Sequence, residues 1–319
     1  MWLEMVVAVV VVGVSLRLWY TYTSGRCTST RSMAGKTVII TGGTAGIGKE
    51  TARDLYRRGA RVIIACRNLD KGHKVAGELV VNKGGDGEVV VRRLDTSDLS
   101  SVRAFAKEML DTEKAIHVLI NNAGIAGPDK REVTADGLEL TMATNHFGHF
   151  LLTNLLLDRL KESAPSRIVN VSSMLHSSVK NFDLGNLAMD KSYLNPYFTS
   201  KLCNVLFTRE LADKMAGTGV TANSLHPGIV RTDIFKTLNP FRFLKMVPVI
   251  YVLSKGATSG AQTNIHLAVA EEVEGLTGRY FSDCKEVASS ELARRKDLAT
   301  GLWEASVKAV KLKKNEIHY

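Results

Sequence analysis

A tyrosine and a lysine stand four residues apart in the segment YFTSK, at Tyr197 and Lys201. Pro196 precedes the tyrosine, and proline is favoured at the first position of a helix, so the spacing predicts that both side chains share one helix face. An ammonium group beside a phenol favours the phenolate and lowers its pKa from about 10. Such a pair could exchange a proton with the oxygen of an alcohol or a carbonyl compound.

A pair of serines ends an apolar run in IVNVSSM, at Ser172 and Ser173. A serine hydroxyl could hold the same oxygen by a hydrogen bond while the tyrosine moves the proton. Because side chains alternate along a strand, only one of the two serines can face such a site. The alternation alone leaves open which one it is.

Three glycines punctuate TVIITGGTAGIGKE, at Gly42, Gly46 and Gly48. They follow an expected strand and begin an expected helix, where glycine lets the backbone turn tightly and approach a pyrophosphate at the helix N-terminus. We therefore predict a dinucleotide site, with Thr44 and Ile47 of the same turn also in contact with the cofactor.

The end of the second expected strand reads IIACRN. An acidic side chain at this place would accept hydrogen bonds from the ribose of NAD, but the sequence has Cys66 followed by Arg67. The planar guanidinium of Arg67 suits a 2′-phosphate, so we predict NADP(H) as the cofactor.

Short β-branched apolar runs alternate with longer amphipathic stretches from Lys36 onward. This alternation predicts an α/β domain with a parallel sheet covered by helices on both faces, a doubly wound Rossmann fold. The seven expected strands are Thr37–Thr41, Arg61–Cys66, Glu88–Leu94, His117–Asn121, Arg167–Val171, Val220–His226 and Thr277–Phe281.

Four motifs in this order resemble the short-chain dehydrogenase/reductase family: TGxxxGxG from Thr41, NNAG at 121–124, Tyr197-x-x-x-Lys201, and Pro227-Gly228. The resemblance implies that Ser173, and not Ser172, acts with Tyr197 and Lys201.

The same resemblance assigns roles to further residues. Asn145, in ATNHFGHF, would hold a water linked to the lysine and complete a proton relay. Asp95 would contact the adenine of the cofactor, Asn121 the adjoining ribose and Thr232 the nicotinamide carboxamide. The segment Pro227-Gly228 would also border the cofactor.

The N-terminus is strongly apolar, with the unbroken run MVVAVVVVGV at residues 5–14. A bilayer span needs roughly 20 residues, so a cleaved secretory signal and a helix lying in the membrane interface are alternatives. The start MWLE is acidic, no A-x-A-like cleavage site follows, aromatic residues flank the run and basic residues follow it. We therefore predict an uncleaved anchor at 1–22, a linker at 23–35 and a cytosol-facing catalytic domain at 36–319.

The net charge is +10, with basic residues concentrated near both ends of the chain. Because no nucleic-acid motif is present, this charge favours a membrane surface and not nucleic acid as the partner. The four cysteines lack paired spacing, which indicates a reducing compartment. His146 and His149 stand three apart but lack a third ligand at matching spacing, so we predict no metal site.

Two insertions, His176–Asn195 and Asp233–Leu253, are expected to shape the substrate pocket. The second contains FRFLKMVPVIYVL, which suits a lid over a lipophilic substrate, a patch dipping into a membrane or a plain core helix.

Together with ACRN, SKLCNVLFTRELA, HPGIVRT, GAQTNIHLA and GRYFSDCK, these features resemble the membrane-bound, NADP-preferring retinol dehydrogenases. The likeness implies reduction of retinal to retinol at the endoplasmic reticulum membrane. The alternatives are a steroid or lipid-aldehyde reductase, or a dinucleotide-binding membrane protein without chemistry. Sequence leaves the oligomeric state open, a homo-oligomer included.

Overall fold

The computed structural model describes residues 2–81, 86–128, 130–187, 195–230 and 254–319. An eight-stranded sheet forms its centre, in the order β3-β2-β1-β4-β5-β6-β7-β8. The strands are β1 (Thr37–Thr41), β2 (Arg61–Cys66), β3 (Glu88–Arg93), β4 (Val118–Asn121), β5 (Ser166–Val171), β6 (Val220–His226), β7 (Tyr280–Ser282) and β8 (Lys285–Glu286).

The first seven strands are parallel, as predicted, and six of them begin and end within one residue of their expected bounds. The prediction of only seven strands is wrong at the edge, where β8 pairs antiparallel with β7. Strand β7 also starts at Tyr280 instead of Thr277. The reason is local: the Thr277 hydroxyl accepts the N–H of Ala222 at 3.0 Å, and Gly278 has a φ of 72°, which is incompatible with a strand.

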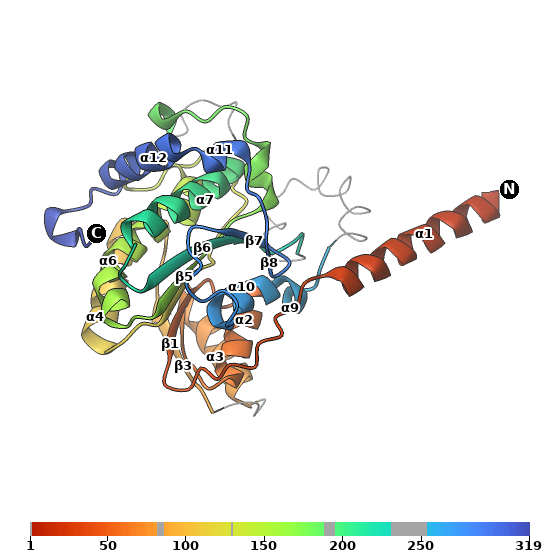
Figure 1. The fold of residues 1–319 in the computed structure, drawn as a ribbon, viewed down its shortest axis with the longest axis horizontal. Helices are drawn as coiled ribbons and strands as arrows, with labels where there is room; N and C mark the ends of the chain where they lie inside the picture. Colours follow the sequence, from red (N-terminus) through yellow and green to blue (C-terminus); the bar gives the residue numbers. More distant parts are fainter. Residues whose placement is uncertain (1, 82–85, 129, 188–194, 231–253) are drawn as a thin grey trace.

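Alternate residues of each strand enter separate cores on the two faces of the sheet. In β1, Ile39 belongs to one core, whereas Val38 and Ile40 belong to the other. The first core packs under α4 (Leu99–Thr112), α6 (Gly148–Glu162), α7 (Pro196–Lys214) and α12 (Lys296–Ala309), and the second under α2 (Gly46–Arg57), α3 (Leu69–Val81) and α10 (Gln262–Val269) (Figure 1). This three-layer arrangement is the predicted doubly wound fold.

Short helical segments complete the described chain. They are α5 (Leu140–Met142), a π-helix (Ala143–Phe147), three 3-10 turns (Met174–Ser178, Leu184–Asn186 and Lys314–Glu316), α9 (Ala257–Gly260) and α11 (Glu291–Arg294). Of the two expected insertions, the first is described only up to residue 187 and at residue 195, and the second lies outside the described residues.

The N-terminal helix α1 (Trp2–Thr23) projects away from the α/β body (Figure 1). Among the residues that the structure describes, no helix combines the length and the apolarity needed to cross a membrane. The expected linker packs onto the domain, since Met33 is buried and the N–H of Cys27 donates to Gln262 Oε1 at 3.1 Å.

Candidate active site

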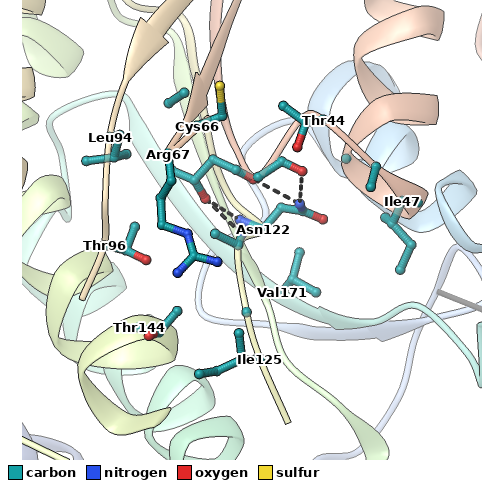
Figure 2. A pocket seen from close by; sticks show the side chains of 18 of the residues that line it. Thr44, Ile47, Cys66, Arg67, Leu94, Thr96, Asn122, Ile125, Thr144 and Val171 are labelled. Carbon is teal, nitrogen blue, oxygen red and sulfur yellow. Dashed lines mark hydrogen bonds between the residues drawn. The ribbon is translucent and has the colours of Figure 1, made fainter. Parts of the chain in front are cut away.

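A cleft with a cavity volume of about 350 Å³ lies over the carboxyl ends of β1, β2, β4 and β5. The chain runs outward from β1 to β3 and then returns to β4 on the other side of β1, so the strand order reverses between β1 and β4. Ligands of open α/β sheets bind at this kind of reversal. Figure 2 shows residues from both sides of the reversal around the cleft, including Arg67 and Asn122.

The turn between β1 and α2 is shaped by its glycines. Gly42 and Gly46 have φ values of 70° and 52°, conformations that other residues rarely adopt. A Cβ on Gly48 would lie 2.4 Å from the Gly42 carbonyl oxygen. Because Ala45 gives α2 no side-chain cap, the first backbone N–H groups of this helix are available to an anion in the cleft. Thr44 and Ile47 line the same cleft.

The end of β2 supplies positive charge to the cleft. Arg67 is exposed, and its side chain extends into the cleft (Figure 2). Cys66 is buried, and its thiol donates to the Asn68 carbonyl oxygen at 3.3 Å. Among the described residues that line the cleft, none is acidic, whereas Arg67, Lys71 and Lys201 are basic.

Two predicted cofactor contacts do not line the cleft. The Asn121 side chain is buried and donates to Asn170 Oδ1 at 2.8 Å and to Thr153 Oγ1 at 2.9 Å. The Asp95 carboxylate accepts hydrogen bonds from the backbone and hydroxyl of Ser97. Side chains alternate at the ends of strands, so their neighbours face the cleft instead.

Those neighbours are Asn122 after β4, and Leu94 and Thr96 after β3. The Asn122 amide donates to the Thr41 carbonyl oxygen at 2.9 Å and thereby ties the end of β4 to the glycine turn (Figure 2). The sequence analysis assigned no role to Asn122, the second asparagine of NNAG.

Helix α7 begins as predicted, at Pro196, and Asn195 caps it by accepting the N–H of Phe198 at 3.2 Å. One turn of this helix brings Tyr197 and Lys201 together, with the lysine Nζ 5.7 Å from the centre of the tyrosine ring. Both residues line the cleft. The buried Lys201 Nζ donates to the Val171 carbonyl oxygen at the end of β5, 3.0 Å away.

Burial controls the ionisation of this pair. It raises the pKa of the Tyr197 phenol, while the hydrogen bond with Ser173 acts in the opposite direction. It lowers the pKa of Lys201 to about 8. The sequence predicted a lowered phenol pKa, but burial outweighs the Ser173 hydrogen bond and raises the pKa in the chain alone, so Tyr197 keeps its proton at neutral pH.

The two serines after β5 have different partners. Ser172 lines the cleft, but its hydroxyl donates to the Lys201 carbonyl oxygen at 2.6 Å and so serves the packing of α7 against the sheet. Ser173 is hydrogen-bonded to Tyr197 instead. Its oxygen also accepts the N–H of Leu175 at 3.2 Å. The hydroxyl beside the phenol is therefore that of Ser173.

Asn145 lies in the π-helix and is fully buried. Its side-chain amide accepts the N–H of Ile125 and donates to the carbonyl oxygen of Ile125, each at 2.9 Å. It also donates to Ser200 Oγ at 3.0 Å. It thus joins the segment after β4 to the first turn of α7. A Cβ on Gly124 would lie 3.2 Å from Asn145 Oδ1 and 3.5 Å from Lys201 Nζ, so the glycine of NNAG permits this close approach.

The sequence analysis also did not predict a hydrogen-bond network around Thr41 and His149 beneath the cleft. The Thr41 hydroxyl accepts the N–H groups of Asn122 and Ala123, each at 2.9 Å, and lies 2.9 Å from His149 Nε2. The other ring nitrogen of His149 is 3.2 Å from the Asn145 carbonyl oxygen, which can only accept. The Nε2 atom of His149 therefore accepts a hydrogen bond from the Thr41 hydroxyl. Burial lowers the pKa of His149 to about 4, which keeps the ring neutral. This histidine orders polar groups around the π-helix.

The loop after β6 closes the cleft on its last side. Pro227 lines it, and Gly228 has a φ of 89°. Thr232, expected to contact the nicotinamide, lies outside the described residues. His146 is hydrogen-bonded with Ser306 at 2.9 Å, away from His149.

A dinucleotide suits this cleft. The glycines leave room where a Cβ would collide with backbone, the uncapped start of α2 offers N–H groups to a pyrophosphate, and the lining is basic. A proton-donating cluster stands beside it, which is the arrangement of a dehydrogenase that works on alcohols and carbonyl compounds.

Comparison with known proteins agrees with this class: residues 36–242 match the family model of the short chain dehydrogenases, and the chain belongs to that family. It is 47% identical to retinol dehydrogenase 12 of Mus musculus over 287 residues, which cover 89% of each chain. It is also 47% identical to retinol dehydrogenase 11 of Homo sapiens, covering 89% of this chain and 88% of the relative. Retinol dehydrogenase 13 of Homo sapiens is 40% identical, with 95% and 92% covered.

Solved structures show the same fold. A Mycobacterium Paratuberculosis protein described as uncharacterized matches with a TM-score of 0.71 at 35% identity, covering 90% of this chain and 98% of that chain. A Beutenbergia cavernae protein described as an NAD(P)-dependent gluconate 5-dehydrogenase, with bound NADP, matches with a TM-score of 0.62 at 27% identity, covering 79% and 96%.

Proposed function

We propose that this protein is a membrane-associated, NADP(H)-dependent oxidoreductase that interconverts retinal and retinol, with reduction as the favoured direction. The observation that carries the chemistry is the position of the Tyr197 phenol, which is hydrogen-bonded to Ser173, one helical turn from Lys201, and lines the dinucleotide cleft. The retinoid substrate is supported by the 47% identity to retinol dehydrogenases over most of both chains.

When bound, NADPH would supply a hydride to the carbonyl carbon. Tyr197 donates its phenolic proton to the carbonyl oxygen as negative charge develops there, and the Ser173 hydroxyl holds the same oxygen. The Lys201 ammonium stabilises the phenolate that remains. Asn145 holds the first turn of α7 in place and, with the lysine, positions a water through which the tyrosine recovers its proton.

The choice of NADP(H) rests on charge at the ribose end of the cleft. Arg67 lines the cleft there, and no carboxylate lines it among the described residues. A guanidinium can bind a 2′-phosphate through two parallel hydrogen bonds. Gly42, Thr44, Gly46, Ile47 and Gly48 would hold the pyrophosphate.

Membrane association rests on α1 and its exposed apolar side chains. Trp2, Val11, Leu18 and Trp19 are all among the large apolar side chains left exposed on this helix. The interface or the interior of the endoplasmic reticulum membrane would cover them, with the catalytic domain on the cytosolic side. The prediction that residues 1–22 anchor a domain at 36–319 belongs to this proposal.

The test of this function is reduction of retinal by membranes that contain the protein, with NADPH compared against NADH. We expect turnover with NADPH, a lower rate with NADH, and no turnover in a Tyr197→Phe variant that still binds NADPH. A panel that adds steroid ketones and medium-chain aldehydes identifies the substrate class, and faster turnover of either would refute the retinoid assignment. Alkaline carbonate extraction tests the anchor, because release of the full-length chain would contradict it.

A further inference from the structure

The base of α1 lies against the carboxyl ends of β6 and β7. The Tyr20 hydroxyl is hydrogen-bonded to the backbone of Ile229, three residues beyond the end of β6. The N–H of Gly25 donates to Asp283 Oδ1 at 3.0 Å, directly after β7. The N-terminal segment is therefore docked on the sheet edge that carries the cleft.

The fit at Gly25 is close. A Cβ there would lie 1.9 Å from the carbonyl oxygen of Asp283, so only glycine permits the contact. Asp283 and Cys284 form the turn between β7 and β8 with φ values of 51° and 60°, a left-handed conformation that is unfavourable for residues with side chains. The N-terminal segment contacts this turn through the Gly25 N–H, which donates to the Asp283 side chain.

Lys255 links this turn to the loop after β6. Its buried side chain forms an ion pair with Asp283, and its Nζ lies 5.4 Å from the centre of the Tyr20 ring. Its backbone N–H donates to the Ile229 carbonyl oxygen at 2.7 Å. Its Cδ and Cε lie 3.0 Å from the position that a Cβ on Gly228 would take. We call this set of contacts the α1 junction; its residues are Tyr20, Gly25, Ile229, Lys255 and Asp283.

The loop held by the α1 junction borders the cofactor cleft, because Pro227 lines it. We propose that Tyr20 and Gly25 are positioning residues for dinucleotide binding: through the α1 junction, the N-terminal segment fixes the Pro227-Gly228 loop. This inference rests on the proposed assignment of the cleft to a dinucleotide. It gives the N-terminal segment a role in cofactor affinity in addition to membrane attachment.

The test uses the full-length chain in lipid nanodiscs, with Tyr20→Phe and Gly25→Ala as variants. Tyr22→Phe is the matched control for the first, since Tyr22 is 91% exposed, and Gly77→Ala for the second, since no atom lies within 4 Å of its added Cβ. The Kd of NADPH and of NADH is measured by quenching of tryptophan fluorescence. KM and kcat for retinal reduction are measured beside it.

We expect the Kd and KM for the dinucleotide to rise about three- to tenfold in Tyr20→Phe, the size of one lost hydrogen bond. The rise should be at least as large in Gly25→Ala, whose Cβ would collide with the Asp283 carbonyl oxygen. In both variants kcat at saturating cofactor should stay within about twofold. The controls should match the unaltered chain. Unchanged dinucleotide affinity in Tyr20→Phe, which removes one hydroxyl and keeps the ring over Lys255, would overturn the inference even if Gly25→Ala failed to fold. Failure of the proposed function has a different signature, namely an unaltered chain that does not reduce retinal.

Discussion

Replacing each of the neighbouring serines by alanine separates packing from chemistry. Ser172→Ala removes a buried 2.6 Å hydrogen bond to the Lys201 carbonyl oxygen. A bond of this kind contributes about 1 kcal/mol net to the free energy of unfolding. In a chain of this size the melting temperature should fall by about 2–4 °C. Turnover should stay within about threefold, because the lost bond is to the Lys201 backbone, whereas the ammonium group keeps its own bond to the Val171 carbonyl oxygen.

Ser173→Ala removes the hydroxyl that contacts Tyr197. Loss of one donor to a developing oxyanion lowers kcat by about 10²- to 10³-fold. The variant also loses the 3.2 Å cap to the Leu175 N–H, at about 0.5–1 kcal/mol, so its stability should resemble that of Ser172→Ala. The two variants therefore act as controls for each other.

The assay is retinal reduction followed by loss of NADPH absorbance, with thermal unfolding of the same preparations. The two variants should lose similar amounts of stability and very different amounts of kcat. Near-normal turnover in Ser173→Ala, or an equal loss of kcat in Ser172→Ala, would refute the assignment of the two hydroxyls.

Three further variants or conditions test the cleft. Arg67→Asp should raise the Kd of NADPH at least about tenfold while NADH affinity holds or improves, because a carboxylate repels the 2′-phosphate; unchanged NADPH affinity would remove the basis of the NADP assignment. Gly48→Ala should abolish dinucleotide binding, since its Cβ would lie 2.4 Å from the Gly42 carbonyl oxygen. If a titration with NADPH still saturated, it would contradict this close packing of Gly48 against Gly42. In the reductive direction kcat/KM for NADPH should fall above about pH 8, because the buried Lys201 loses its proton there. Tyr197 has a raised pKa and still holds its proton at that pH. A pH profile that stays flat to pH 10 would count against this order of ionisation.

The parallel strands were predictable because each is a short β-branched run flanked by turn residues. The edge hairpin was not, since β8 has only two residues and its turn places Asp283 and Cys284 in a conformation that their residue types do not signal. Strand β7 was displaced for a similar reason, because the Thr277 side chain takes the hydrogen bond that strand pairing would have used.

Within the site, the spacing of residues along the chain correctly predicted which side chains share a helical turn. It did not predict which side chains at the ends of strands face the cleft. The helical turn from Tyr197 to Lys201 follows from spacing alone. The choice between Asn121 and Asn122 depends on which face of β4 meets the cleft, and the sequence carries no sign of it. The contribution of His149 and Thr41 was invisible because it depends on tertiary contact between α6 and the end of β1.

The ionisation of Tyr197 and Lys201 affects which direction of the reaction is favoured. A phenol whose pKa is raised by burial is protonated at neutral pH, so the chain alone holds the form that reduction of a carbonyl requires. Oxidation would require the phenolate, and Lys201 must then remain charged to stabilise it although burial holds its pKa at about 8. The anionic phosphates of a bound dinucleotide would favour the ammonium form in either direction. Above about pH 8, where the free chain loses this proton, the charge on Lys201 would therefore depend on the bound dinucleotide.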